Sequence, residues 1–170
     1  DEKSAAVEIG LQPLANRRTD RNLSANNTAY AAFGQATYTP NVLDQRLHLT
    51  VGARWSRDKR EATKVDAPSL ISNGTPLPIA AGDAKRRYSD FSPSAVIAFD
   101  ASDNVNLYAK VATGYKTGGF NLSSSSIATF QAGFGPESVT SYELGVKSNW
   151  LNNTLRVNAA LFTARYDDLQ

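Results

Sequence analysis

Apolar and polar residues alternate with a period of two along most of this chain. In the clearest run, Arg46 to Asp58, the odd positions from Leu47 to Trp55 are apolar and the even positions are almost all polar. A period of two places successive side chains on opposite faces of a β-strand. The same pattern recurs at 91–100, 105–116, 142–150 and 155–162, and more weakly at 30–38. The pattern predicts an all-β, antiparallel meander of about six long strands.

The connections between these strands alternate in length. The segments "TPNVLDQ", "ASDN" and "LNN" are short and rich in turn-forming residues, whereas about Val65 to Gly82 and Leu122 to Pro136 are long. Short turns at one end and long loops at the other are typical of a transmembrane β-barrel. Soluble sandwiches mix their connections through Greek-key crossovers.

Alternation alone fits a soluble sandwich as well as a membrane barrel, so the aromatic residues are informative. Phe91 and Phe99 share one face eight positions apart, as do Tyr142 and Trp150. At about 3.3 Å per residue and a tilt near 40°, such a pair spans roughly 20 Å, close to the ~25 Å apolar band of membrane barrels. We therefore predict a lipid-facing girdle made of Tyr38, Trp55, Phe91, Phe99, Tyr115, Tyr142 and Trp150.

About six strands are too few to close a membrane barrel, because bacterial single-chain barrels begin at about eight. The chain is therefore expected to be a segment of a larger barrel. Residues 29–170 would be the partial barrel, and residues 1–28 an extracellular loop remnant or a strand extension. No plug domain is expected within the chain.

Composition argues against several kinds of chemistry. The chain has no cysteine, a net charge of +2 and only short basic clusters, so a nucleic-acid partner is not expected. Its single histidine, His48, lies on the polar face of its strand, and no Gly-x-Ser-x-Gly motif is present. We predict that the chain is not an enzyme, with no catalytic residue, no cofactor and no metal site.

The stretch "GYKTGGFN" at 114–121 invites comparison with a phosphate-binding loop. Such a loop needs its lysine after the last glycine and a helix behind it. Here the lysine precedes the glycine pair, and no helix is predicted to follow. We interpret the stretch as the outer end of a barrel strand, with Lys116 facing the lumen and Tyr115 facing lipid.

Basic residues on the polar faces and hydroxyls in the second long loop are the candidate ligand contacts. The basic residues could form a wall that attracts an anion, or they could be ordinary lumen residues paired with Glu143 and its neighbours. Loops on a rigid scaffold often carry recognition, which favours Asn121 to Pro136. The candidates are Arg54, Lys110, Lys116, Asn121, Ser123 and Ser124. The cluster Lys85-Arg86-Arg87 could instead contact lipopolysaccharide phosphates.

Four stretches of the chain resemble TonB-dependent outer-membrane receptors, over about residues 29–170. These are "YAAFGQATYTP", "LHLTVGARWSRDKRE", "NLYAKVATGYKTGGFN" and the segment from "PESVTSYELGVK" onwards. The ordered motif comprises Phe134, Pro136, Glu137, Tyr142, Glu143, Gly145 and Lys147. The likeness is greatest to the group of such receptors found in sphingomonads and caulobacters.

The resemblance implies a barrel of about 22 strands in the bacterial outer membrane with an N-terminal plug domain. It implies import of a scarce nutrient, with a ferric siderophore favoured over cobalamin or an oligosaccharide. TonB, ExbB and ExbD would act through the plug, and membrane lipid and lipopolysaccharide would surround the barrel. The alternatives are a soluble β-sheet binding module and a passive porin-like barrel.

Overall fold

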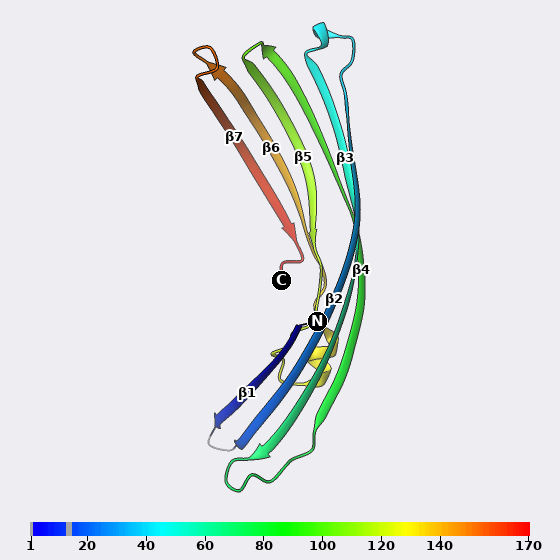
Figure 1. Ribbon diagram of the computed structural model, residues 1–170, viewed down its shortest axis with the longest axis vertical. Helices are drawn as coiled ribbons and strands as arrows, with labels where there is room; N and C mark the ends of the chain where they lie inside the picture. Colours follow the sequence, from blue (N-terminus) through cyan, green and yellow to red (C-terminus); the bar gives the residue numbers. More distant parts are fainter. Residues whose placement is uncertain (1, 13–14) are drawn as a thin grey trace. The chain divides into compact units, whose positions relative to one another are not determined.

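The computed structural model describes residues 2–12 and 15–170, with side chains from Arg17 onwards. Its strands are β1 (Glu2–Gln12), β2 (Ala15–Tyr38), β3 (Leu47–Leu70), β4 (Ala80–Ser102), β5 (Val105–Lys116), β6 (Glu137–Trp150) and β7 (Leu155–Asp167). All lie in one sheet in the order β1-β2-β3-β4-β5-β6-β7 (Figure 1). The predicted all-β antiparallel meander is confirmed. Among the described residues, no helix has the length and apolar character needed to cross a membrane.

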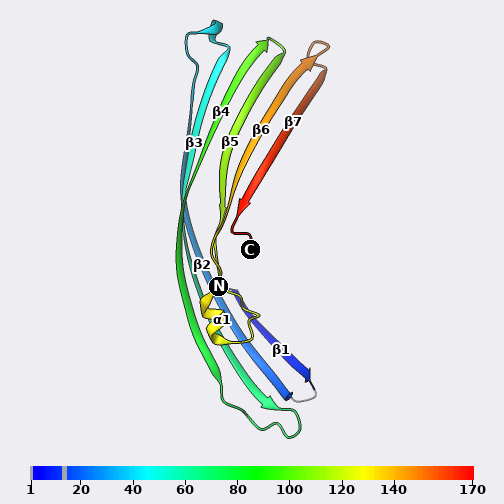
Figure 2. The ribbon, with the colours of Figure 1, turned by 180° about the vertical axis from the view of Figure 1, so that it is seen from behind.

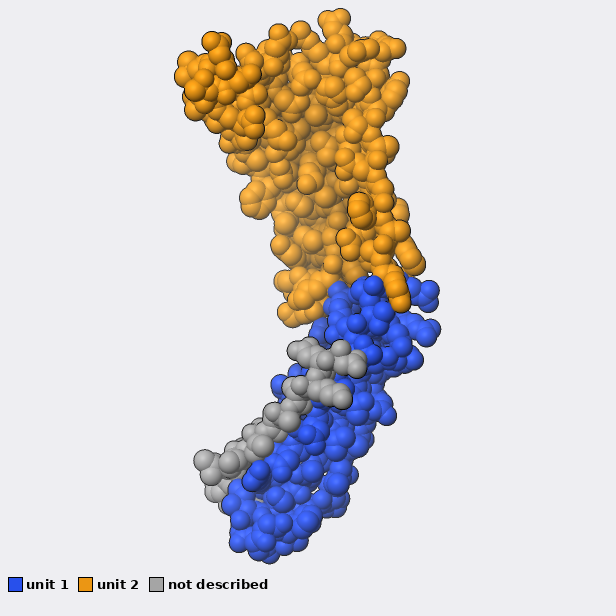
Figure 3. All heavy atoms as spheres, in the orientation of Figure 1, with its two compact units in different colours: residues 1–29, 57–88, 117–135 blue, residues 30–56, 89–116, 136–170 orange. Residues whose placement is uncertain are grey.

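The chain divides into two compact units, which Figure 3 colours separately. Unit 1 contains residues 1–29, 57–88 and 117–135; unit 2 contains residues 30–56, 89–116 and 136–170. The long strands β2, β3 and β4 each contribute to both units. The strands β5, β6 and β7 lie entirely in unit 2, whereas residues 117–135, which connect β5 to β6, belong to unit 1.

Unit 2 has a sheet with two chemically different faces. The register pairs Leu107 with Phe99 on one side and with Val146 on the other, and pairs Leu144 with Leu161. We call this apolar side the outward face; its large side chains are exposed in the isolated sheet. The opposite side, the inward face, carries the polar residues that alternate with them. The alternation read from the sequence therefore becomes a continuous apolar surface across four strands.

The predicted alternation of short and long connections holds only in part. From β2 to β7 the connections are 39–46, 71–79, 103–104, 117–136 and 151–154, and the one at 71–79 is barely longer than the one at 39–46. All three residues of the turn at Leu151 to Asn153 have positive φ, and so do all three residues of the 3-10 turn Leu43–Gln45. Asn and Asp tolerate this left-handed conformation better than most residues, which suits the "LNN" and "LDQ" sequences.

Two predicted boundaries were wrong because paired backbone continues into polar sequence. The loop expected from about Val65 to Gly82 is confined to 71–79, since β3 runs to Leu70 and β4 begins at Ala80. A hydropathy pattern loses its signal where neither face is apolar, although the hydrogen-bonded ladder continues.

The N-terminal segment is mostly strand. β2 extends the expected strand at 30–38 back to Ala15, and β1 adds a seventh strand, paired antiparallel with β2 from Glu2↔Ala25 to Gln12↔Ala15. Position 1 and the connection at 13–14 lie outside the described residues. The extracellular location of residues 1–28 stays a prediction.

A short helix, α1 (Ile127–Ala132), lies in the β5–β6 connection (Figure 2). The expectation that no helix follows "GYKTGGFN" was therefore wrong. Ser126 caps the helix by accepting a hydrogen bond from the Thr129 amide at 3.1 Å. The cap accounts for one of the four consecutive serines at 123–126. The phosphate-loop interpretation still fails, since Lys116 precedes Gly118 and Gly119.

Candidate ligand-binding site

The inward face of unit 2 carries paired positive and negative side chains on β5 and β6. The register places Lys110 opposite Glu143 and Lys116 opposite Glu137. Lys116 Nζ lies 3.7 Å from Glu137 Oε2, and the Lys116 side chain remains 65% exposed. An exposed ion pair of this kind contributes only about 0–1 kcal/mol. Lys116 is therefore paired, but with Glu137 rather than Glu143, and it still faces open space.

Arg54 lies on the inward face of β3 and is exposed. Its Nε donates a hydrogen bond to Ser56 Oγ at 3.1 Å. Contacts of Gly52 with Ser94 and of Thr113 with Pro93 hold β3, β4 and β5 in register. That register brings Arg54 to the level of the outer end of β5, about 10 Å away across one intervening strand.

On the inward face, Tyr108 lies beside three residues of β6 that form a Glu-x-Gly-x-Lys motif, namely Glu143, Gly145 and Lys147. Its hydroxyl donates to Glu143 Oε1 at 2.5 Å, and Lys147 Nζ lies 5.0 Å from the centre of its ring. The ring lies over Gly145, where an added Cβ would come within 2.5 Å of it. One tyrosine on the neighbouring strand therefore explains the spacing of this motif. Glu143 accepts a hydrogen bond from its hydroxyl, Gly145 leaves room for its ring, and Lys147 places a cation over the face of the ring.

His48 lies near the short-turn end of the inward face, as expected. Its ring nitrogens lie 2.9 Å from Thr39 Oγ1 and 2.9 Å from Asp100 Oδ2. Asn106 Nδ2 donates to the other oxygen of Asp100 at 2.8 Å. These bonds tie β3, β4 and β5 together. Over residues 2–12 and 15–170, the structure contains no group of three or more His, Cys, Asp or Glu side chains arranged to hold a metal ion.

In unit 1 the β5–β6 connection folds onto the inward face of the strand extensions. We call residues 117–135 the strap. Phe130 of the strap is fully buried against Ala62 of β3 and Ala84 of β4, with Phe120 and Leu122 packed beside it. The rings of Phe120 and Phe130 are 5.8 Å apart. Both alanines continue the even-numbered, inward positions of their strands, so the strap covers the inward side of the unit 1 sheet.

Polar contacts fix the strap along β4. Arg86 Nη2 donates to the Ala132 carbonyl at 2.8 Å, and the Tyr88 hydroxyl donates to the Phe134 carbonyl at 3.2 Å. Gly118 is needed here, because a Cβ would lie 2.4 Å from the Phe134 carbonyl oxygen. The glycine pair therefore permits a close approach of two backbone segments.

Lys64 is buried beneath the strap with 0% of its surface exposed. Its ammonium group donates to the Ser124 carbonyl oxygen, and it lies 3.6 Å from Asp66 Oδ2. Arg21 Nε lies 3.4 Å from the other oxygen of Asp66. A buried ammonium needs such partners to offset its lost hydration. Lys64 thus joins the strap to β3.

The candidate loop residues differ in how accessible they are. The Asn121 side chain accepts the Ser123 amide at 3.0 Å, which shapes the turn that begins the strap. Ser124 is buried, with its hydroxyl 3.4 Å from Lys64 Nζ. Ser123 is exposed. Of the three, only Ser123 offers a freely accessible hydroxyl. Ligand contact by any of them stays a prediction.

Sequence reasoning missed Lys64, Arg21 and Asp66 as a cluster. The alternation at 46–58 continues through Ala62, Lys64 and Asp66, so an inward face could have been extended to them. Their burial was not foreseeable, since it depends on a strap supplied from residues 117–135.

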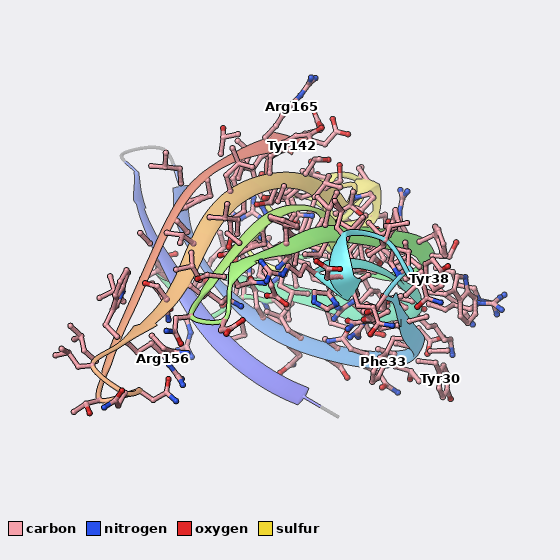
Figure 4. The ribbon with its side chains drawn as sticks, turned by 90° about the horizontal axis from the view of Figure 1, so that it is seen from above. Tyr30, Phe33, Tyr38, Tyr142, Arg156 and Arg165 are labelled. Atoms are coloured by element: carbon pink, nitrogen blue, oxygen red, sulfur yellow. The ribbon has the colours of Figure 1, made fainter. Side chains whose placement is uncertain are left out.

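The predicted girdle residues all lie on the outward face of unit 2. Contacts of Asp100 with Arg46 and of Ser94 with Gly52 share one β3–β4 register, which places Trp55 opposite Phe91. Continuing the β4–β5 register places Tyr115 next in this row. Phe99 lies beside Leu107, Trp150 beside Leu155, and Tyr38 and Tyr142 are labelled in Figure 4. Their contact with lipid stays a prediction.

Comparison with known proteins identifies related sequences and structures. Residues 5–170 match the family described as TonB dependent receptor-like, beta-barrel. The fold is similar to that of the ferric yersiniabactin uptake receptor FyuA from Yersinia pestis, with a TM-score of 0.68 and 23% identity over 91% of this chain. The alcaligin outer membrane receptor FauA from Bordetella pertussis matches over 91% of this chain with 19% identity and a TM-score of 0.43. The chain spans 22% of the first protein and 31% of the second.

Proposed function

This chain belongs to the family of TonB-dependent receptor β-barrels, and from that premise we propose that it forms part of a receptor that imports a scarce nutrient. Barrels of this family lie in the outer membrane, and so does this segment. The family consists of receptors and transporters, and we propose binding and transport without catalysis for this chain. A ferric siderophore is the favoured ligand class, ahead of cobalamin or an oligosaccharide.

The observation that carries the ligand class is the set of exposed cations on the inward face of unit 2. Arg54, Lys110 and Lys116 are all exposed there. Ferric siderophore complexes are often anionic, and cations lining a concave wall raise the local concentration of an anion. A protein of similar fold, FyuA, is described as a ferric yersiniabactin uptake receptor, which agrees with this ligand class.

The remaining parts of the proposal concern the complete protein. TonB, ExbB and ExbD would supply proton-motive energy through a plug domain. The aromatic residues of the outward face of unit 2 would contact lipid. The strap would present Asn121 and Ser123 to the ligand, while Ser124 would serve mainly to hold Lys64.

Uptake by the full-length receptor in a strain lacking other siderophore receptors tests this function. We expect uptake of a radiolabelled anionic ferric siderophore to stop when TonB is deleted. Uptake that persists without TonB would support a passive porin-like barrel instead.

The ligand class is tested separately by binding to the purified receptor. Arg54→Gln and Lys110→Gln are each expected to weaken binding of an anionic ferric complex about fivefold, the effect of losing ~1 kcal/mol. Arg18→Gln is the matched control, because Arg18 is exposed but paired with Asp20 at 3.1 Å in unit 1. Equal losses for a neutral complex would contradict the electrostatic basis.

A further inference from the structure

The connection between β3 and β4, within unit 1, contains the single Asn-Gly pair of the sequence, Asn73-Gly74. The chain reverses here in a tight turn, because the Leu70 amide donates a hydrogen bond to the Thr75 carbonyl at 2.9 Å. Residues 71–74 therefore form a four-residue loop closed by backbone pairing. Asn73 and Gly74 are both exposed.

The turn explains why these two residue types stand next to each other. Gly74 has a φ of 70°, in the left-handed region that favours glycine. Its amide donates to the Leu70 carbonyl at 2.8 Å, and the Thr75 amide donates to Asn73 Oδ1 at 3.0 Å. A side-chain oxygen that accepts from the backbone two residues on forms an Asx turn, for which Asn and Asp are the preferred residues. The fold of this turn thus uses both Asn73 and Gly74.

The same pair has a reactivity that the turn does not need. Asparagine is among the thermolabile residues, because the peptide nitrogen that follows it can attack the side-chain carbonyl carbon. In this chain a bond would form between Gly74 N and Asn73 Cγ, and the side-chain nitrogen would leave as ammonia with the proton from Gly74 N. Water would then open the cyclic imide at either carbonyl, to give aspartate or isoaspartate. Glycine favours ring closure because it has no Cβ to obstruct the attack.

The closed turn opposes this reaction at both reacting groups. The nitrogen that must attack holds its hydrogen against the Leu70 carbonyl, and the carbonyl that must be attacked is held by the Thr75 amide. Both hydrogen bonds must break before the ring can close. Exposed connections open locally far more often than the whole fold unfolds. The rate of the reaction in the folded protein should therefore follow the opening of this turn.

We propose that Asn73 is a site of spontaneous deamidation, whose rate in the folded receptor is set by opening of the 71–74 turn. The inference is independent of nutrient import. The isoaspartate product routes the backbone through the side chain, which adds a methylene group to the chain and leaves a new carboxylate. That product cannot re-form the Asx turn with Thr75, so each event leaves a loosened and more acidic connection between β3 and β4.

The test follows the purified full-length receptor during incubation in a mildly alkaline buffer, either folded in detergent or unfolded in urea. Peptide mass spectrometry measures deamidation at Asn73, and isoaspartyl methyltransferase labelling identifies the isoaspartate. We expect deamidation in the folded receptor at a rate roughly 25-fold below that of the unfolded chain, about fivefold for each of the two hydrogen bonds.

Asn153 provides a matched control within the same molecule. It is exposed in the turn between β6 and β7, and the amide that follows it, that of Thr154, donates to the Leu151 carbonyl at 3.1 Å. The two asparagines therefore share exposure and a hydrogen-bonded following amide, but Asn153 is followed by a β-branched residue that crowds the attack. Asn153 should stay unmodified in the folded receptor and react more slowly than Asn73 in the unfolded chain.

Three outcomes would overturn the proposal. Equal rates at Asn73 in the folded and unfolded receptor would show that the turn does not control the reaction. An unmodified Asn73 in the folded receptor, after a time that converts the unfolded chain many times over, would show that the turn does not open enough to react. Equal accumulation of isoaspartate at Asn73 and Asn153 would show that Gly74 does not select the site.

Discussion

The two units use the same alternating strands for opposite purposes. In unit 2 the outward face is apolar and the inward face is open and polar, with Lys116 exposed. In unit 1 the outward face is charged, and the inward face is covered by the strap around Phe130 and Lys64. Along a single strand such as β3, the apolar side chains of unit 2 thus lie on the outward face, whereas the buried side chains of unit 1 lie on the inward face. Alternation defines two faces, but the surroundings of each segment decide which face is buried.

The largest expected effect comes from placing a charge on the outward face of unit 2, and the same kind of substitution on the outward face of unit 1 provides the comparison. Leu144→Arg in unit 2 should destabilise the folded full-length barrel by about 2–4 kcal/mol, because a cation would lie in hydrocarbon. Thr63→Arg on the outward face of unit 1 should change stability by no more than about 0.5 kcal/mol. Urea unfolding in lipid vesicles measures both. Equal costs would mean that the two outward faces do not differ in environment.

The strap gives the second contrast, between the two faces of β3 within unit 1. Lys64→Met should keep most of the packing but leave the Ser124 carbonyl without its donor, at a cost of about 2 kcal/mol. Opening of the strap should then become roughly 30-fold more frequent, which hydrogen exchange at the Thr129 and Phe130 amides would record. Lys59→Met, on the outward face of the same strand, is the control and should leave these amides unchanged. Unaltered exchange in Lys64→Met would show that the lysine does not hold the strap.

Gly145 lies on the inward face of unit 2, where the Tyr108 side chain leaves no room for a residue larger than glycine. Gly145→Ala should cost about 1 kcal/mol, because its Cβ would press on the Tyr108 ring that Glu143 holds in place. Gly34→Ala in the same unit meets nothing within 4 Å and should be neutral or slightly stabilising. Adding Tyr108→Ala should remove the difference between the two alanine variants. If the difference persists, the ring is not the cause.

The contrast between units also marks how far sequence reasoning reaches. The strands and faces of unit 2 could be predicted because apolar and polar residues alternate strictly at Leu47 to Trp55 and at Val105 to Val111. In unit 1, β1 and the extension of β3 to Leu70 carry no comparable apolar face, so they were not recognised. The candidate cations Arg54, Lys110 and Lys116 lie on the inward face, and their contact with a ligand stays a prediction. The role of Ser124 was not foreseeable, because it depends on Lys64, which is 60 positions earlier in the chain.

The smallest expected effect concerns Glu61, on the charged outward face of unit 1. Lys59 and Lys85 lower the pKa of Glu61 in the folded chain. A carboxyl group with a lowered folded pKa stabilises the fold above its unfolded pKa, and that contribution is lost as pH falls through the folded pKa. Carboxyl-carbon NMR of the detergent-solubilised receptor should therefore give a Glu61 midpoint below the ordinary glutamate value near 4.3. Lys59→Gln/Lys85→Gln should raise that midpoint towards the ordinary value, whereas Lys110→Gln in unit 2 should leave it unchanged. A midpoint that is the same in all three proteins would show that solvent screens this charged face too strongly for its cations to act on Glu61.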